Sequence, residues 1–315
     1  MRSGPPLVAV LTLFTAPRLP AQASQPFSTA PRLTGYFQPR FQTLGDSASF
    51  FLRRVRFAVE GNVTPWASYR AQIEMSTNGV GPGAAAPLAF SATDVFIRLA
   101  HRAWGATVGQ FKVPFSLESL LGSTTLETTE RSRIVSAAKR DIGAQAEWTS
   151  AGRLTLQAAI VNGEGPNRAV NLDNRMAYYA RAVVTPLKGL DVGGAYEGYS
   201  DSAGANVQGL YRSGRWTARA EYIDEHNRRS HVHTKGWYGL AGYYAIPQRV
   251  ELVGRVEQFD PSDLVATDRS TGYLIGLQYF MRGDNFKILA DYEAFREQAV
   301  QVSNNRGVVQ LQVRW

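Results

Sequence analysis

The sequence predicts an all-β protein, a sixteen-stranded antiparallel transmembrane β-barrel. Two observations lead to this fold class. Segments of strand length alternate apolar and polar residues along most of the 315-residue chain, as strands between lipid and water must. The connections between these segments alternate between short and long, which is typical of the two rims of a bacterial barrel.

The chain opens with a segment typical of a secretion signal. A short apolar run, residues 7–16, precedes the small-x-small cleavage pattern Ala21-Gln22-Ala23. The alternative, a buried N-terminal helix, is disfavoured because Pro17 and Pro20 would break it. We therefore expect a signal peptide over residues 1–23.

Residues 24–315 are expected to form a single barrel domain. No stretch in them approaches the roughly 20 consecutive apolar residues of a transmembrane helix, so a membrane crossing would use strands. The last segment shows the required pattern, because the residues between its apolar positions are polar. These apolar positions are Val309, Leu311, Val313 and Trp315.

Period-two alternation marks sixteen segments, and an even number places both ends of a barrel at the same rim. Their expected bounds are 33–42, 50–61, 67–77, 94–100, 105–111, 141–149, 153–162, 176–186, 190–199, 205–213, 215–224, 235–246, 250–259, 272–281, 285–296 and 305–315. The connections after even-numbered segments are short, and those after odd-numbered segments are mostly longer. A soluble β-sandwich does not require this rhythm.

Aromatic residues fall near segment ends, where the girdle of a membrane barrel would lie. The alternative is that any β-protein is rich in aromatic residues. The girdle candidates are Trp66, Trp104, Trp148, Trp216, Tyr243, Tyr279 and Trp315.

Composition argues against several other functions. The chain has no cysteine, which removes thiol nucleophiles, redox motifs and cysteine metal sites. The net charge is +8, but basic residues are mixed with acidic ones and form no patch for nucleic acid. No nucleophile motif lies beside His101, so we expect no enzyme, no catalytic residue and no cofactor. His231 and His233 alternate in a predicted outer loop, where solvated side chains are favoured over a metal site.

The longest connection, residues 112–140, is rich in charged residues. In a sixteen-stranded barrel, whose lumen is wide enough for water, such a loop is expected to fold inward and narrow the pore. Around it the chain resembles the phosphate-selective porins of the porin O and porin P type. The resemblance is carried by the stretches 109–118 (GQFKVPFSLE), 140–143 (RDIG) and Asn162-Gly163, with 52–56 (LRRVR) upstream.

The resemblance implies an outer-membrane barrel, a homotrimer, with short periplasmic turns, long extracellular loops and an inward-folded third loop that shapes an anion-passing constriction. It places Lys112 and Arg140 at the two ends of that loop, near the constriction. Arg54 and Arg56 would face the lumen from the second strand.

Strand alternation turns both signs of charge inward. The pore-lining and anion-binding candidates are Arg54, Arg56, Arg70, Arg98, Arg181, Arg219 and Arg255, together with Lys112 and Arg140. The acidic residues of the same faces include Glu60, Glu74, Asp94, Glu147, Glu221, Glu257 and Glu293. Each arginine therefore has two interpretations: it binds passing anions, or it pairs with an acidic neighbour and stiffens the wall.

The sequence thus favours a passive channel in the bacterial outer membrane for small polar solutes, with anions such as phosphate as the preferred cargo and the lipid bilayer as its surroundings. Two alternatives remain open. One is a non-conducting barrel that is plugged by its long loop and serves adhesion or a structural role. The other is a soluble secreted β-protein.

Overall fold

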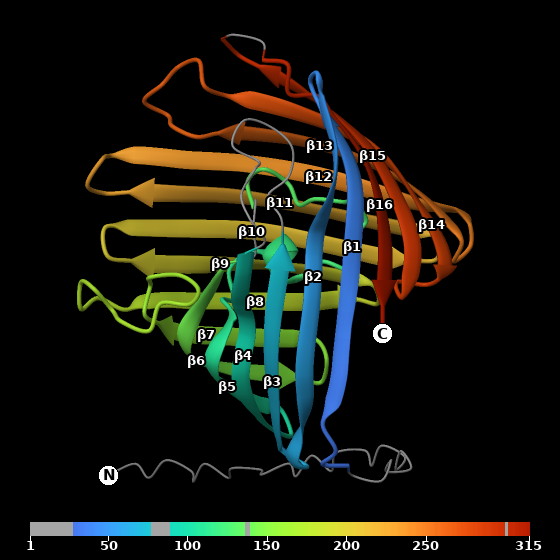
Figure 1. The fold of residues 1–315 in the computed structure, drawn as a ribbon. Coiled ribbons are helices and arrows are strands. Elements are labelled where there is room, and N and C mark those ends of the chain that lie inside the picture. The colour runs from blue at the N-terminus through green and yellow to red at the C-terminus, as the bar shows by residue number, and fades with distance from the viewer. Residues whose placement is uncertain (1–27, 77–88, 136–138, 300–301) are drawn as a thin grey trace, which may run out of the picture.

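The computed structural model describes residues 28–76, 89–135, 139–299 and 302–315. These residues form sixteen strands and one short helix (Figure 1). The elements are β1 (Arg32–Leu44), β2 (Ser47–Thr64), β3 (Ala67–Ser76), β4 (Ala89–His101), β5 (Trp104–Lys112), α1 (Leu117–Leu120), β6 (Arg140–Ser150), β7 (Leu154–Val161), β8 (Ala177–Leu187), β9 (Leu190–Tyr199), β10 (Ser202–Ser213), β11 (Trp216–Asn227), β12 (Val232–Ile246), β13 (Val250–Asp260), β14 (Ser270–Arg282), β15 (Phe286–Glu297) and β16 (Arg306–Arg314).

The strands close into a barrel in which each pairs with the next and β1 pairs with β16. Every pairing is antiparallel, as in the register Tyr36↔Arg314 that joins the first strand to the last. The predicted sixteen-stranded antiparallel barrel is confirmed. The predicted signal peptide lies outside the described residues, so that boundary stays a prediction. Within the described residues, no helix is long and apolar enough to cross a membrane.

The two faces of the wall follow the predicted alternation. On β11, Trp216 and Tyr222 are exposed on the outside, whereas Thr217, Arg219 and Glu221 are buried inside. The same pattern holds on β13 and β15. An apolar exterior and a charged interior are what a bilayer and a hydrated lumen require, and they exclude the soluble alternative.

The connections define two rims. At the short-turn rim, connections after even-numbered strands are tight, as between β10 and β11 through Gly214 and Arg215. At the other, the long-loop rim, two connections are also tight, because β1 and β2 join through Gly45 and Asp46, and β9 and β10 through Ser200 and Asp201. Gly45 has a positive φ of 54° that suits such a turn.

The seven aromatic residues expected near strand ends all lie at the short-turn rim. Trp104 packs against Trp148, and Trp216 against Tyr243, with ring centroids 6.3 and 4.7 Å apart. Trp66 and Trp315 are exposed, and both lie at strand ends of the same rim. This arrangement is the aromatic belt of a membrane barrel.

A bulge in β2 changes the alternation near the long-loop rim. The register with β1 shifts between Gln38, which pairs with Arg54, and Pro39, which pairs with Leu52. Proline has no N–H for the ladder, and a bulge is where a strand tolerates it. The extra residue is Arg53, so two successive arginines turn toward the interior.

Candidate functional site: the third loop and the lumen

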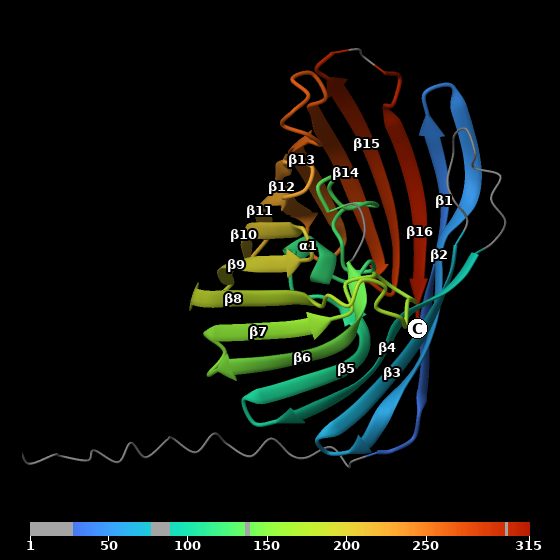
Figure 2. The same ribbon diagram turned by 90° about the vertical axis from the view of Figure 1, so that its left-hand side faces the viewer.

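The connection between β5 and β6, here called loop 3 (residues 113–139), enters the barrel (Figure 2). Its two ends are joined, because Val113 N donates to the carbonyl oxygen of Lys139 at 3.2 Å. Ser116 caps α1 by accepting a hydrogen bond from Ser119 N at 3.2 Å. Most described side chains between 113 and 135 are buried, so the loop packs against the wall and the inward-folded arrangement is observed.

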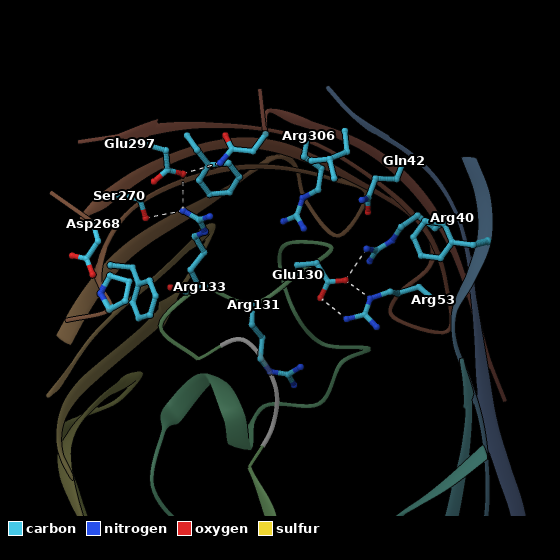
Figure 3. A pocket seen from close by; sticks show the side chains of 17 residues that line it. Arg40, Gln42, Arg53, Glu130, Arg131, Arg133, Asp268, Ser270, Glu297 and Arg306 are labelled. Carbon is cyan, nitrogen blue, oxygen red and sulfur yellow. Dashed lines mark hydrogen bonds and ion pairs between the residues drawn. The ribbon is translucent and has the colours of Figure 1, made fainter. Parts of the chain in front are cut away.

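Glu130 anchors loop 3 to β1 and β2. Arg40 Nη1 donates to its Oε1 at 2.6 Å, Arg54 Nη2 to its Oε2 at 3.1 Å, and Arg53 also binds the carboxylate. Figure 3 shows Glu130 between Arg40 and Arg53. Burial alone would raise the pKa of Glu130, but Arg54, Arg53 and Arg40 hold that pKa well below its ordinary value.

A second anchor lies on β10 and β11. Arg219 Nη2 donates to Glu118 Oε1 at 2.8 Å and also binds Glu127, which Arg212 reaches at 3.2 Å. Burial opposes ionisation of Glu127, but Arg219 and Arg212 lower its pKa below the ordinary value. Loop 3 is therefore held by ion pairs on two sides of the lumen.

A third anchor uses the loop backbone. Thr129 N donates to Asp291 Oδ2 at 2.6 Å, and Arg255 Nη1 donates to the carbonyl oxygen of Glu130 at 2.9 Å. Arg255 Nη2 also binds Glu293 at 2.7 Å. These contacts tie the loop to β13 and β15.

Two basic side chains at loop 3 donate hydrogen bonds to backbone carbonyl groups instead of carboxylates. Lys112 Nζ donates to the carbonyl oxygens of Leu120 and Leu121 at 3.1 and 2.8 Å. Arg131 Nη2 donates to Leu121 O at 2.8 Å, and its Nε to Glu118 O at 2.9 Å. Among the described residues, neither side chain has a carboxylate oxygen within ion-pair distance. Burial, followed by repulsion from Arg54, lowers the pKa of Arg131 to about 10.

The remaining sequence-predicted candidates pair along the wall. Arg56 binds Glu74 and Arg70 binds Glu60, each with its direct partner on the neighbouring strand. Arg140 Nε lies 2.7 Å from Asp94 Oδ1. The interpretation that wall arginines pair with acidic neighbours fits all three.

Two candidates lie farther from loop 3. Arg98 reaches Glu147 at 2.8 Å across β5, where a Cβ on Gly105 would lie only 3.1 Å from the guanidinium. Arg181 binds an amide, Gln157 Oε1, at 2.8 Å. The side chains of Arg70 and Arg98 keep 29% and 36% of their surface exposed, so water reaches the inner face of β3 and β4 near the short-turn rim.

Sequence reasoning missed Arg40, Arg53 and Arg131. Arg40 follows the same alternation as the neighbouring inward residues of β1 and was available from that pattern. Arg53 was hidden by the bulge, for which Pro39 is the only local signal. Arg131 lies in loop 3, where no periodicity indicates direction.

Two cavities lie on opposite sides of loop 3. The outer cavity, at the long-loop rim, has a volume of about 730 Å³; its charged lining residues are Arg40, Arg53, Arg131, Arg133 and Arg306, with Glu130, Asp268 and Glu297. The inner cavity, at the short-turn rim, has a volume of about 430 Å³; its charged lining residues are Arg212 and Lys287, with Glu127, Glu251 and Asp284.

Two of the four histidines form a pair at the long-loop rim. His226 and His233 stack with ring centroids 4.1 Å apart, and His233 Nδ1 lies 3.0 Å from Asp224 Oδ1. In the described part of the chain, no three histidine or carboxylate side chains are grouped to hold a metal ion.

The fold is that of the outer-membrane porins. The structure is similar to OmpF of Salmonella typhi in complex with daunomycin (TM-score 0.67, 13% identity, 90% of this chain and 97% of that one). It is also similar to the outer membrane channel DcaP of Acinetobacter baumannii (TM-score 0.64, 10% identity, 90% and 97%). OmpT of Vibrio cholerae, solved in a trimer form, matches with TM-score 0.64 and 12% identity over 91% of this chain and 99% of that one. A search of curated protein sequences found no match.

The sequence identifies the family. The profile of phosphate-selective porin O and P matches residues 34–211 and 201–315, so the chain belongs to this family and the resemblance found in its sequence is confirmed. The protein is an outer-membrane porin. Its family and fold are those of channel proteins and not of enzymes.

Proposed function

We propose that this outer-membrane channel prefers anions, phosphate included. The observation that carries the proposal is the pair Lys112 and Arg131, whose side chains donate to carbonyl oxygens and, among the described residues, form no ion pair with a carboxylate. Lys112 is the last residue of β5, where loop 3 begins, and Arg131 lies within loop 3. A basic group that is hydrogen-bonded to carbonyl oxygens can release them and donate to the oxygens of an anion instead. These new hydrogen bonds replace part of the hydration shell of the passing anion.

The wall itself contributes less to the preference. Arg56, Arg70, Arg98 and Arg140 each pair with a carboxylate, so their charges largely cancel. Their role in the proposal is to continue a polar path on which binding stays weak enough for exit. Phosphate as cargo rests on the family, and the long-loop rim is assigned to the cell exterior by the usual asymmetry of bacterial barrels.

The reversal potential of the purified protein in a planar bilayer under a salt gradient tests the sign of selectivity. We expect anion preference, and we expect Lys112→Glu or Arg140→Glu to reduce it more than Arg314→Glu, because Arg314 lies at the short-turn rim. Cation preference in the wild type would end the anion proposal and leave the porin assignment intact.

We also propose a homotrimer, in line with the trimer form in which OmpT of Vibrio cholerae was solved. Chemical cross-linking of the protein in detergent should give a limit at three subunits. A product that stops at one or two subunits would contradict it.

A plugged, non-conducting barrel is the second candidate, and one observation favours it: loop 3 is anchored to three parts of the wall. Well-folded protein that inserts into a bilayer but passes no current would support the plug. Steady single-channel current would reject it.

A further inference from the structure

The outer cavity combines aromatic rings with arginines. Phe51 on β2, Phe259 on β13 and Phe295 on β15 all contribute to its lining. Phe259 shares the inward face with Arg255 and Glu257, and the bulge at Arg53 brings Phe51 to the same side. A hydrated inorganic ion gains nothing from apolar rings, so these residues point to a solute with an apolar body.

The arginines of the cavity retain binding capacity. The side chains of Arg53, Arg133 and Arg306 keep 31%, 36% and 22% of their surface exposed although each has an acidic partner. Figure 3 shows Arg133 and Arg53 on opposite sides of the cavity, with Glu130 between them. Five arginines face three carboxylates in the lining, so the cavity carries an excess of positive charge.

One arginine is already stacked on a ring. Arg133 Cζ lies 4.2 Å from the centroid of Phe295, and its Nη1 donates to Ser270 Oγ at 2.7 Å. A guanidinium held in this way offers a flat face for a second ring and unused N–H groups for a carboxylate. A planar aromatic acid can use one of these features of Arg133 and bring its other group to a second arginine of the cavity lining.

We propose that the outer cavity is a binding site for aromatic carboxylates, which it selects before they pass loop 3. The volume of about 730 Å³ lies within the range of small-molecule sites. The role in permeation rests on the proposed anion channel, whereas binding in the cavity does not require conduction.

Equilibrium dialysis of the detergent-folded full chain at low salt tests the binding step. The probes are benzoate, acetate, cyclohexanecarboxylate and inorganic phosphate. We expect benzoate to bind about tenfold more tightly than acetate, and about threefold more tightly than cyclohexanecarboxylate, which has the same charge without a flat π face. Benzoate binding no tighter than acetate would overturn the site.

Variants locate the binding. Phe259→Leu and, independently, Phe51→Leu should weaken benzoate about threefold or more and leave phosphate unchanged. Arg133→Gln should weaken benzoate about tenfold. The matched control is Arg229→Gln, which removes the same charge from an exposed loop at the same rim; an equal loss in that variant would mean that general charge attraction, not the cavity, binds benzoate.

Bilayer recordings separate the two proposals. If benzoate binds as expected but no current passes, the cavity site stands and the anion channel fails. If current is anion-selective while benzoate and acetate bind alike, the channel stands and the cavity site fails.

Discussion

The outer and inner cavities lie in one barrel, yet loop 3 makes them chemically different. The outer cavity has five basic and three acidic lining residues, and the inner one has two basic and three acidic. Loop 3 gives Glu130, Arg131 and Arg133 to the first and Glu127 to the second. Without loop 3, the wall gives the outer cavity three basic and two acidic lining residues and the inner cavity two of each. The difference teaches that a folded-in loop can enlarge the positive excess on one side of itself and make the other side negative.

The difference between the two cavities should be lost most completely when loop 3 is released from the wall. Glu130→Gln leaves Arg40, Arg53 and Arg54 without their shared carboxylate, and removing one partner of a buried ion cluster costs about 3 kcal/mol. We expect loop 3 to lose its contact with β1 and β2, with larger current fluctuations and stronger anion preference. Single-channel recording measures both.

Asp268→Asn is the control for that variant, because it removes one negative charge from the same cavity without freeing an arginine cluster. It should change selectivity slightly and leave the current noise unchanged. Equal noise in the two variants would show that Glu130 does not anchor the loop.

Acid should release the same anchors without mutation. The pKa values of Glu130 and Glu127 are lower in the folded protein than the ordinary value of about 4.3. Their stabilisation is therefore present above that value and is lost only as the pH falls through the depressed pKa values. We expect no increase in current noise from about pH 8 to pH 5 and unstable currents below about pH 4. Current instability that begins near pH 6 would show that groups other than Glu130 and Glu127 anchor loop 3.

Two lysines sharpen the comparison. Lys112→Gln removes a basic side chain that has no carboxylate partner among the described residues, whereas Lys287→Gln removes one that binds Asp284 at 2.8 Å in the inner cavity. A charge at the constriction acts on a passing ion with about 1 kcal/mol, or roughly fivefold in preference. The reversal potential should therefore move strongly for Lys112→Gln and little for Lys287→Gln. The reverse order would mean that the inner cavity controls selectivity.

The smallest expected effect is rectification. A positive outer cavity and a negative inner cavity should make the current at opposite voltages differ, by less than about twofold at low salt. The asymmetry should disappear in 1 M salt, where the screening length is about 3 Å. Glu251→Gln should reduce it in dilute salt; an unchanged ratio would show that the inner carboxylates do not act on the current.

The wall was accessible from sequence because each strand residue faces either lipid or lumen, and period two records that choice. Arg219 and Arg255 were placed inward on this basis, and the structure has them there. The pairing of Arg56 with Glu74 could be proposed as a type of contact, but its register depends on the neighbouring strand.

The interior of the lumen could not be read in the same way. Arg54 looked like a wall residue that contacts passing ions, and the structure has it bound to Glu130 of loop 3. Arg131 had no pattern to indicate it, since its position depends on how loop 3 folds. Arg53 could not be found by alternation, because one inserted residue reverses the direction of every side chain beyond it.

The sequence by itself determined the closed antiparallel barrel and the family, because a bilayer imposes a residue-by-residue alternation that local composition must obey. Only the tertiary structure decided which basic side chains pair with a carboxylate. The arginines around Glu130 meet a partner more than 70 positions away, and Lys112 and Arg131 meet theirs within an aperiodic loop. Ion pairing depends on distances of a few ångströms between side chains, and such distances are set by packing across the lumen.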